Sequence, residues 1–209
     1  MARSFDDATR RNIAELCAAF TRLAPADAGP MLKRAAVAIA LTEADDGIGT
    51  ALLLTRRSAS LRSHRAQWAL PGGRCDAGET QVQSALRELH EELGMALGER
   101  DVLGMLDDYP TRSGYLITPV VVWAGARAAI TPNPDEVASV HRIGLDAIEA
   151  DDVFTFVTIP ESTRRVIRFR LGGSHIHAPT AALIYQFREV LAGRNTRVAD
   201  LEQPVFAWK

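Results

Sequence analysis

The chain has 209 residues, of which 47% are hydrophobic and 24% charged, a composition typical of a globular protein with a sizeable core. Its 24 lysines and arginines nearly balance its 26 aspartates and glutamates, and the net charge of −2 argues against nucleic-acid binding through a strongly basic surface. Two cysteines cannot build a disulfide framework, which favours a reducing compartment. Neither a secretory signal nor an apolar run of about 20 residues, as a membrane-spanning helix needs, is recognisable. We therefore expect a cytoplasmic protein without nucleic-acid or membrane partners.

The first half of the chain predicts one helix and a pair of strands. Ile13, Leu16 and Phe20 recur at helical spacing within residues 6–23, inside an N-terminal helical extension that we assign to residues 1–30. Two short apolar runs on either side of the turn-rich segment ADDGIG then predict strands at 35–43 and 50–57.

The second half alternates further helices and strands. Helices are expected at 80–93 and at 180–191, the latter ending before Gly193. Strands are expected at 102–108, 115–123, 137–143 and 166–170. This order predicts an α/β fold with helices packed against a mixed sheet. We expect one domain over residues 1–209, with residues 195–209 as a C-terminal tail.

The helix expected at 80–93 carries two contrasting faces. Its apolar stripe, which should pack on the sheet, consists of Val82, Leu86, Leu89 and Leu93. Glu88, Glu91 and Glu92 fall on the opposite side at spacings of three and four, so their carboxylates can converge. Arg87 lies on the flank and can reach only part of the set. Such an all-oxygen cluster suits a hard cation, Mg²⁺ or Mn²⁺; the alternative is a solvated helix face.

The segment around this helix fits one extended pattern, G-x5-E-x7-R-E-U-x-E-E-x-G-U, in which U is a bulky aliphatic residue. The specified positions are filled by Gly73, Glu79, Arg87, Glu88, Leu89, Glu91, Glu92, Gly94 and Met95. A complete match over one short window makes the solvated-face interpretation untenable. The segment resembles the Nudix box of the Nudix hydrolase family, and the resemblance implies an α/β/α sandwich with a mixed sheet and a loop–helix catalytic box.

The resemblance also implies roles for these residues. Glu88, Glu91 and Glu92 would bind the metal, assisted by the Gly72 carbonyl. Independently of the resemblance, Glu79 and Arg87 carry opposite charges at the two ends of the loop–helix unit, so an ion pair between them would lock the loop and position the glutamates. The implied reaction is attack of water on phosphorus, which splits a pyrophosphate bond in a nucleoside diphosphate derivative.

Three further patterns in the sequence are less specific than the box. Gly73–Thr80 has the spacing of a P-loop, but Glu79 stands where that motif needs lysine and would repel a triphosphate. Glu136 is either a further metal ligand, or general base, or an edge-strand surface residue. His175 and His177 would share one strand face, but no third metal ligand is apparent beside them.

Upstream of the box, the segment LLLTRRSASLRSHRAQWALPGG resembles the extra signature of the coenzyme A diphosphatase branch, from which it departs at Ala66 and Leu70. Candidates for phosphate or adenosine contacts in this segment are Arg56, Arg57, Arg62, His64 and Gln67. For each arginine the alternative is a solvated basic loop.

The expected function is metal-dependent hydrolysis of coenzyme A or acyl-coenzyme A to 4′-phosphopantetheine (or its acyl form) and adenosine 3′,5′-bisphosphate. Two alternatives stay open. The first is a Nudix hydrolase for another nucleotide, such as a sugar nucleotide, ADP-ribose or a nucleoside triphosphate. The second is a non-catalytic nucleotide-sensing module. The expected partner is a small nucleotide substrate, and a homodimer would be common for the family.

Overall fold

The computed structural model describes residues 3–23, 32–59, 67–125 and 129–204. The elements, in chain order, are α1 (Asp7–Ala19), β1 (Lys33–Glu43), β2 (Thr50–Arg57), β3 (Trp68–Ala69), β4 (Gly72–Arg74), α2 (Gln81–Leu93), the 3-10 turn η1 (Glu99–Asp101), β5 (Val102–Met105), β6 (Tyr109–Pro110), β7 (Tyr115–Trp123), β8 (Val137–Gly144), α3 (Leu145–Glu149), β9 (Phe154–Ile159), β10 (Ser162–Leu171), β11 (Ser174–His177) and α4 (Thr180–Leu191). No described helix has both the length and the apolar character needed to span a membrane.

A mixed sheet forms the centre of the molecule. Its main path runs β3-β2-β1-β7-β5, while β8 pairs with β2, β4 with β1 and β6 with β7. β1 runs parallel to β7 and antiparallel to β2 and β4. Because β1 lies inside the sheet and is covered on both faces, its sequence is a nearly continuous apolar run.

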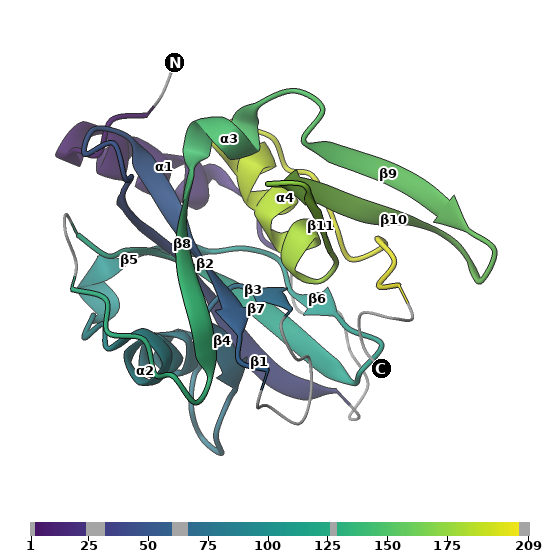
Figure 1. The fold of residues 1–209 in the computed structure, drawn as a ribbon, viewed down its shortest axis with the longest axis horizontal. Coiled ribbons are helices and arrows are strands. Elements are labelled where there is room, and N and C mark those ends of the chain that lie inside the picture. Colours follow the sequence, from purple (N-terminus) through teal and green to yellow (C-terminus); the bar gives the residue numbers. More distant parts are fainter. Residues whose placement is uncertain (1–2, 24–31, 60–66, 126–128, 205–209) are drawn as a thin grey trace.

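The two faces of β1 contribute to two different cores. Ala36, Ala38 and Ala40 face the core that contains α2, where their small side chains allow the helix to lie close to the strand. Ile39 and Leu41 point the other way, into the larger core that contains residues of α1, α3 and α4. Figure 1 shows α2 separated from α1, α3 and α4 by the strands of the large sheet. The expected mixed α/β architecture with helices on both faces is confirmed.

A smaller antiparallel sheet, in the order β11-β10-β9, packs beside α4. Its inner face contributes Phe169 and Ile176 to the larger core, together with Phe187 of α4. The β9–β10 hairpin extends outward from this contact, at the right of Figure 1. In this sheet the sequence predicts only the strand at 166–170, which lies in the second half of β10.

Most predicted elements are confirmed with small changes at their ends. The helix expected at 6–23 stops earlier, since α1 ends at Ala19 and Phe20 is already extended. The reason is a tertiary interaction: the backbone N–H of Leu23 donates to Asp107 at 2.7 Å, and Arg22 forms an ion pair with Asp108 at 2.6 Å. These bonds draw the chain away from the helix axis.

Candidate active site

The helix α2 is defined at both ends by its own sequence. At its start the Thr80 hydroxyl accepts from the Gln83 N–H at 3.2 Å, while the Gln83 side chain accepts from the Thr80 N–H at 3.0 Å. This reciprocal capping box satisfies two N–H groups that the helix leaves unpaired. At its end Gly94 takes the left-handed conformation, with φ of +70°. The glutamates of the box therefore lie on a helix with fixed ends.

Arg87 connects the preceding loop to the glutamates. Its guanidinium donates to both carboxylate oxygens of Glu79, at 2.9 and 3.0 Å, and also to Glu88 at 2.9 Å and Glu91 at 2.8 Å. Hydrogen bonding to Arg87 lowers the pKa of Glu79, and the same contact with Glu79 raises the pKa of Arg87. The expected Glu79–Arg87 pair is present, and Arg87 reaches Glu88 and Glu91 as the spacing suggested. It makes no recorded bond to Glu92.

Glu92 lies in a different environment from the other two glutamates. It is only 3% exposed, and its carboxylate accepts from the Gly72 N–H at 3.3 Å, with Arg57 of β2 3.7 Å away. Burial raises the pKa of Glu92 to about 8, although Arg57 opposes the shift. The expectation that all three glutamates face away from the sheet is therefore wrong for Glu92. It sits at the border of the apolar stripe, where the helix meets β4.

Two glycines of β4 lie in close contact with neighbouring elements, Gly72 with β1 and Gly73 with α2. Gly72 has φ of +151°, and a Cβ on it would overlap the backbone of Ala36 and Val37. A Cβ on Gly73 would instead overlap the carboxylate of Glu88. Gly72 therefore requires glycine for both space and conformation, whereas a Cβ on Gly73 would displace only the end of the Glu88 side chain.

The donor chemistry of this site fits a hard divalent cation. Burial raises the pKa of Glu88, and the negative charge of Glu136 raises the pKa values of both Glu88 and Glu92 further. Mutually repelling, partly desolvated carboxylates are stabilised by a cation between them. In the described chain, however, no three acidic, histidine or cysteine side chains converge closely enough to hold an ion. The expected convergence is incomplete because Arg87 draws Glu91 outward, where it is exposed.

A cavity of about 880 Å³ borders this site. Its walls come from β1, β2, β3, β4, the β6–β7 loop, β11 and the start of α4. Among the substrate-contact candidates, Arg56, Arg57 and Gln67 line it. The Arg56 guanidinium lies 5.5 Å from the centre of the Trp68 ring, which also lines the cavity. A cavity of this size is in the range that small-molecule sites occupy.

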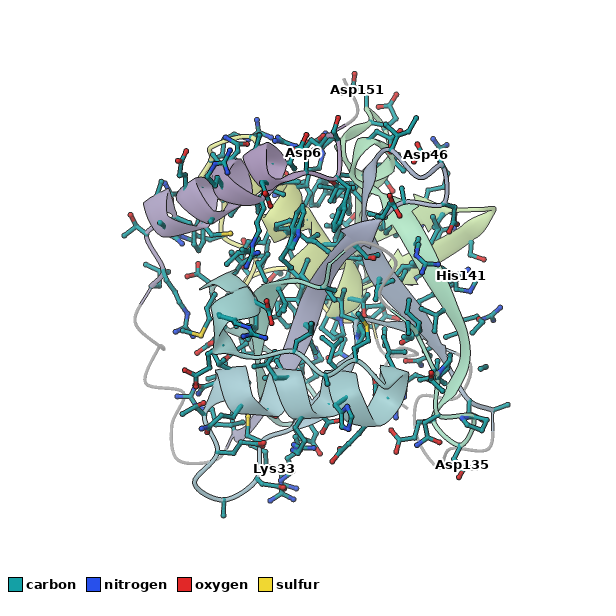
Figure 2. All side chains as sticks on the ribbon, turned by 90° about the vertical axis from the view of Figure 1, so that its left-hand side faces the viewer. Asp6, Lys33, Asp46, Asp135, His141 and Asp151 are labelled. Carbon is teal, nitrogen blue, oxygen red and sulfur yellow. The ribbon has the colours of Figure 1, made fainter. Side chains whose placement is uncertain are left out.

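The remaining sequence candidates are distributed as follows. Arg62 and His64 lie outside the described residues. Glu136 precedes β8, and its backbone carbonyl accepts from the Ser58 N–H at 2.8 Å. Figure 2 shows α2 lying across the sheet and labels Asp135, which precedes Glu136, just before the start of β8. Glu136 is half-buried and lies near enough to Glu88 and Glu92 to affect both pKa values.

Sequence reasoning missed that the small sheet contributes to the wall of the cavity. His175 and His177 share one face of β11, as their spacing suggested, and they line the cavity together with Gln203. No local sequence pattern indicates that these residues line a cavity, because the small sheet reaches the cavity only through its packing on α4. Gln203 belongs to the segment 195–209, which the sequence predicts to be a C-terminal tail.

Comparison with known proteins agrees with this geometry. The NUDIX domain model matches residues 31–160. The chain is 42% identical over 143 residues to the uncharacterized Nudix hydrolase NudL of Photorhabdus laumondii, covering 66% of this chain and 75% of that protein. NudL of Pectobacterium atrosepticum is 44% identical over 96 residues, which are 46% of this chain and 50% of that protein, so here the match spans only half of the relative.

One solved structure illustrates the structural comparison. The MutT protein from Methanosarcina mazei Go1 is 25% identical, with a TM-score of 0.42 over 56% of this chain and 81% of that one. The family of this chain is assigned from two other matches. One is the family model, which spans more than half of the chain, and the other is the relative from Photorhabdus. On these two matches, together with the complete box on α2, the chain belongs to the NUDIX domain family.

Proposed function

We propose that this protein hydrolyses a pyrophosphate bond in a nucleoside diphosphate derivative, with the help of a divalent metal ion. One observation is the main support for this proposal. The carboxylates of Glu88 and Glu92 are held against Gly72 and Gly73 where these glycines line a cavity large enough for a nucleotide. Burial and repulsion between two neighbouring glutamates cost folding free energy, and groups perturbed in this way are concentrated at functional sites.

The proposed metal ligands are Glu88, Glu91 and Glu92, with Glu136 and the Gly72 carbonyl as further candidates. When bound there, Mg²⁺ or Mn²⁺ would neutralise phosphate charge and lower the pKa of an attacking water. The chain's own contribution is to hold these oxygen donors. Arg87 positions Glu88 and Glu91 from the flank, and Glu79 fixes Arg87 through two hydrogen bonds.

For the substrate we propose coenzyme A or an acyl derivative. The signature between residues 52 and 73 supports this choice, as do Arg56, Arg57 and Gln67, which it contributes to the cavity wall. Arginine suits this role because its planar fork can form two hydrogen bonds to one phosphate. Arg62 and His64, from the same signature, are proposed as further contacts.

A turnover screen tests both levels of the proposal. Coenzyme A, acetyl-coenzyme A, ADP-ribose, a sugar nucleotide and a nucleoside triphosphate would each be incubated with Mg²⁺ or Mn²⁺, and the products separated by chromatography. The expected result is preferential release of adenosine 3′,5′-bisphosphate from coenzyme A, and its loss when a chelator removes the metal. A clear preference for another nucleotide would refute the coenzyme A assignment alone. Turnover that persists in chelator would refute the metal mechanism.

A further inference from the structure

The side-chain amide of Gln203 lies at the wall of the cavity. Gln203 lines the cavity, and its Oε1 accepts from the backbone N–H of Arg112 at 3.1 Å. Arg112 stands between Thr111 and Ser113, both of which also line the cavity. Because a backbone N–H can only donate, the amide oxygen must face Arg112, and the NH₂ group must take the opposite position.

This NH₂ group has no acceptor within the described chain. The hydrogen bonds of Gln203 there are made by its Oε1 and by its backbone N–H, which donates to Glu202 at 3.0 Å. Although Gln203 is only 3% exposed, its Nε2 is not among the fully enclosed side-chain atoms of the described residues that lack a partner. The NH₂ group is therefore an accessible donor, and the space open to it is the cavity that Gln203 lines.

Ser113 adds a hydrogen-bond acceptor beside this donor. The Thr111 hydroxyl donates to the carbonyl of Tyr115 at 3.1 Å and accepts from the N–H of the same residue at 2.9 Å. The Ser113 hydroxyl donates to the Thr111 hydroxyl at 3.0 Å, so its proton is committed and its lone pairs are left for a ligand. Ser113 is exposed and lines the cavity. A donor and an acceptor therefore lie on the two sides of Arg112.

An apolar wall continues from these two groups toward the glutamates. Tyr115 and Ile117 share one face of β7 and line the cavity, as the flat faces of a nucleobase would require. On β1 the partner of Tyr115 is Lys33. The partner of Gly73, the glycine that contacts Glu88, is Ala36, three positions further along. Three positions span about 10 Å of strand, which the ribose and first phosphate of a nucleotide can bridge.

We propose that Gln203 and Ser113 recognise the adenine base of the substrate. The Gln203 NH₂ group donates to a ring nitrogen, and the Ser113 hydroxyl accepts from the 6-amino group. Adenine presents this acceptor and donor side by side, with either N1 or N7 next to the amino group. The inference rests on the proposed function, which places the pyrophosphate beside the glutamates. Gln203 lies outside residues 31–160, which the family model matches, so this contact is a feature of the present chain.

Binding of adenosine 5′-monophosphate (AMP) and its analogues tests the contact without catalysis. In 1-deaza-AMP and 7-deaza-AMP one ring nitrogen is replaced by C–H, and purine riboside 5′-monophosphate lacks the 6-amino group. In titration calorimetry the unaltered protein should bind AMP about fivefold more tightly than one of the two deaza analogues. Gln203→Leu and Gln203→Glu should reduce this preference to about twofold or less. Ser113→Ala should likewise remove the preference for AMP over the purine riboside.

The variants control for one another. Gln203→Glu keeps an oxygen that can accept from Arg112, and each preference is a ratio within one protein, so a general change in affinity cancels. Gln81→Leu is the matched control, because Gln81 is on α2 and does not line the cavity. Thermal unfolding identifies any variant that does not fold, and the others then carry the test. Equal binding of AMP and all three analogues by the unaltered protein would refute the subsite, as would preferences that survive in both Gln203 variants.

Further comparisons separate this proposal from its alternatives. The amides of 4′-phosphopantetheine also present donors and acceptors, so weaker binding of that compound by Gln203→Leu, with the AMP preference intact, would overturn the adenine assignment. If the AMP preferences hold but no nucleotide is hydrolysed, the subsite stands and the proposed function fails. If coenzyme A is hydrolysed with a KM that Gln203→Leu and Ser113→Ala leave within about twofold, the subsite is refuted and the proposed function stands.

Discussion

Glu92 of α2 is both a buried residue and a proposed metal ligand. It is buried next to Leu93 like a core residue, yet it carries a carboxylate whose pKa burial raises to about 8. We expect Glu92→Gln to lower kcat by at least about a hundredfold, because an amide is a weaker metal ligand than a carboxylate. The same change should not lower the free energy of unfolding, because it removes an ionisable group from a buried site.

The measurements for Glu92→Gln are steady-state turnover and urea unfolding of the metal-free protein. The exposed Glu99, in the turn after α2, provides a matched control through Glu99→Gln, which should alter neither quantity. Near-normal turnover by Glu92→Gln would mean that this carboxylate does not bind the metal.

Gly72 and Gly73 are adjacent, but their substitution by alanine should have different effects. At Gly72 a Cβ meets backbone atoms and φ is +151°, so Gly72→Ala should lower the free energy of unfolding by about 1–3 kcal/mol. At Gly73 the Cβ meets only the end of the Glu88 side chain, which can rotate away. Gly73→Ala should therefore change stability by less than about 1 kcal/mol while reducing turnover about tenfold or more.

Each glycine variant serves as the control for the other, with stability measured by urea unfolding and turnover by steady-state kinetics. The reverse ranking, in which Gly73→Ala is the less stable and Gly72→Ala the less active, would contradict the role assigned to Glu88.

At the scale of elements, the loop before α2 is joined to the helix through one carboxylate. Glu79 accepts two hydrogen bonds from Arg87 and a third, at 2.9 Å, from the Asp76 N–H. Glu79→Gln keeps the size of the side chain but loses the charge that fixes Arg87. We expect a fall in kcat of about tenfold with little change in KM, because the metal ligands lose their positioning while the cavity is unaltered.

Steady-state kinetics with the exposed Asp76→Asn as control would measure this effect within the same loop. A rise in KM with unchanged kcat would instead place Glu79 in substrate binding.

The elements that sequence reasoning predicted are those whose signals are local. The helix at 80–93 has an apolar stripe, a threonine cap and a terminal glycine, and α2 confirms all three. The strands β9 and β11 and the short α3 were not predicted. β11 has only Ser174–His177, and its position depends on pairing with β10. Likewise, the contact between Arg87 and Glu79 was predictable from spacing, whereas that between Arg57 and Glu92 arises only when β2 and α2 meet.

At the scale of the whole molecule, the C-terminal segment shows that the fold depends on packing between residues far apart in the sequence. The sequence predicts only a C-terminal tail over residues 195–209, yet Val198 and Leu201 are buried in the larger core, and Arg197 pairs with Asp107 at 2.6 Å. The expectation of one domain over residues 1–209 stays a prediction, and this packing supports it. Composition alone could not reveal this packing, because the residues that contact the segment lie far away in the sequence.

Glu202 anchors this segment, and its contacts predict how the stability of the protein depends on pH. Its carboxylate accepts from Arg112 and from the Ser162 hydroxyl, and these bonds lower its pKa from 4.5 to about 2. Since the pKa is lower in the folded than in the unfolded state, the stabilisation is complete above 4.5 and is lost as the pH falls through about 2. Glu202→Gln should therefore lower the free energy of unfolding by about 1–3 kcal/mol near neutral pH.

Urea unfolding at a series of pH values measures this contribution as the difference between the unaltered protein and Glu202→Gln. Asp45→Asn is the control, since that carboxylate is 78% exposed and its pair with Arg142 at 3.5 Å should contribute less than about 0.5 kcal/mol. The difference for Glu202 should shrink as the pH falls below 4.5, because the unfolded chain then takes up a proton that the folded protein does not bind until about pH 2. A difference that stays constant over this range would mean that Glu202 holds the segment through packing rather than through its charge.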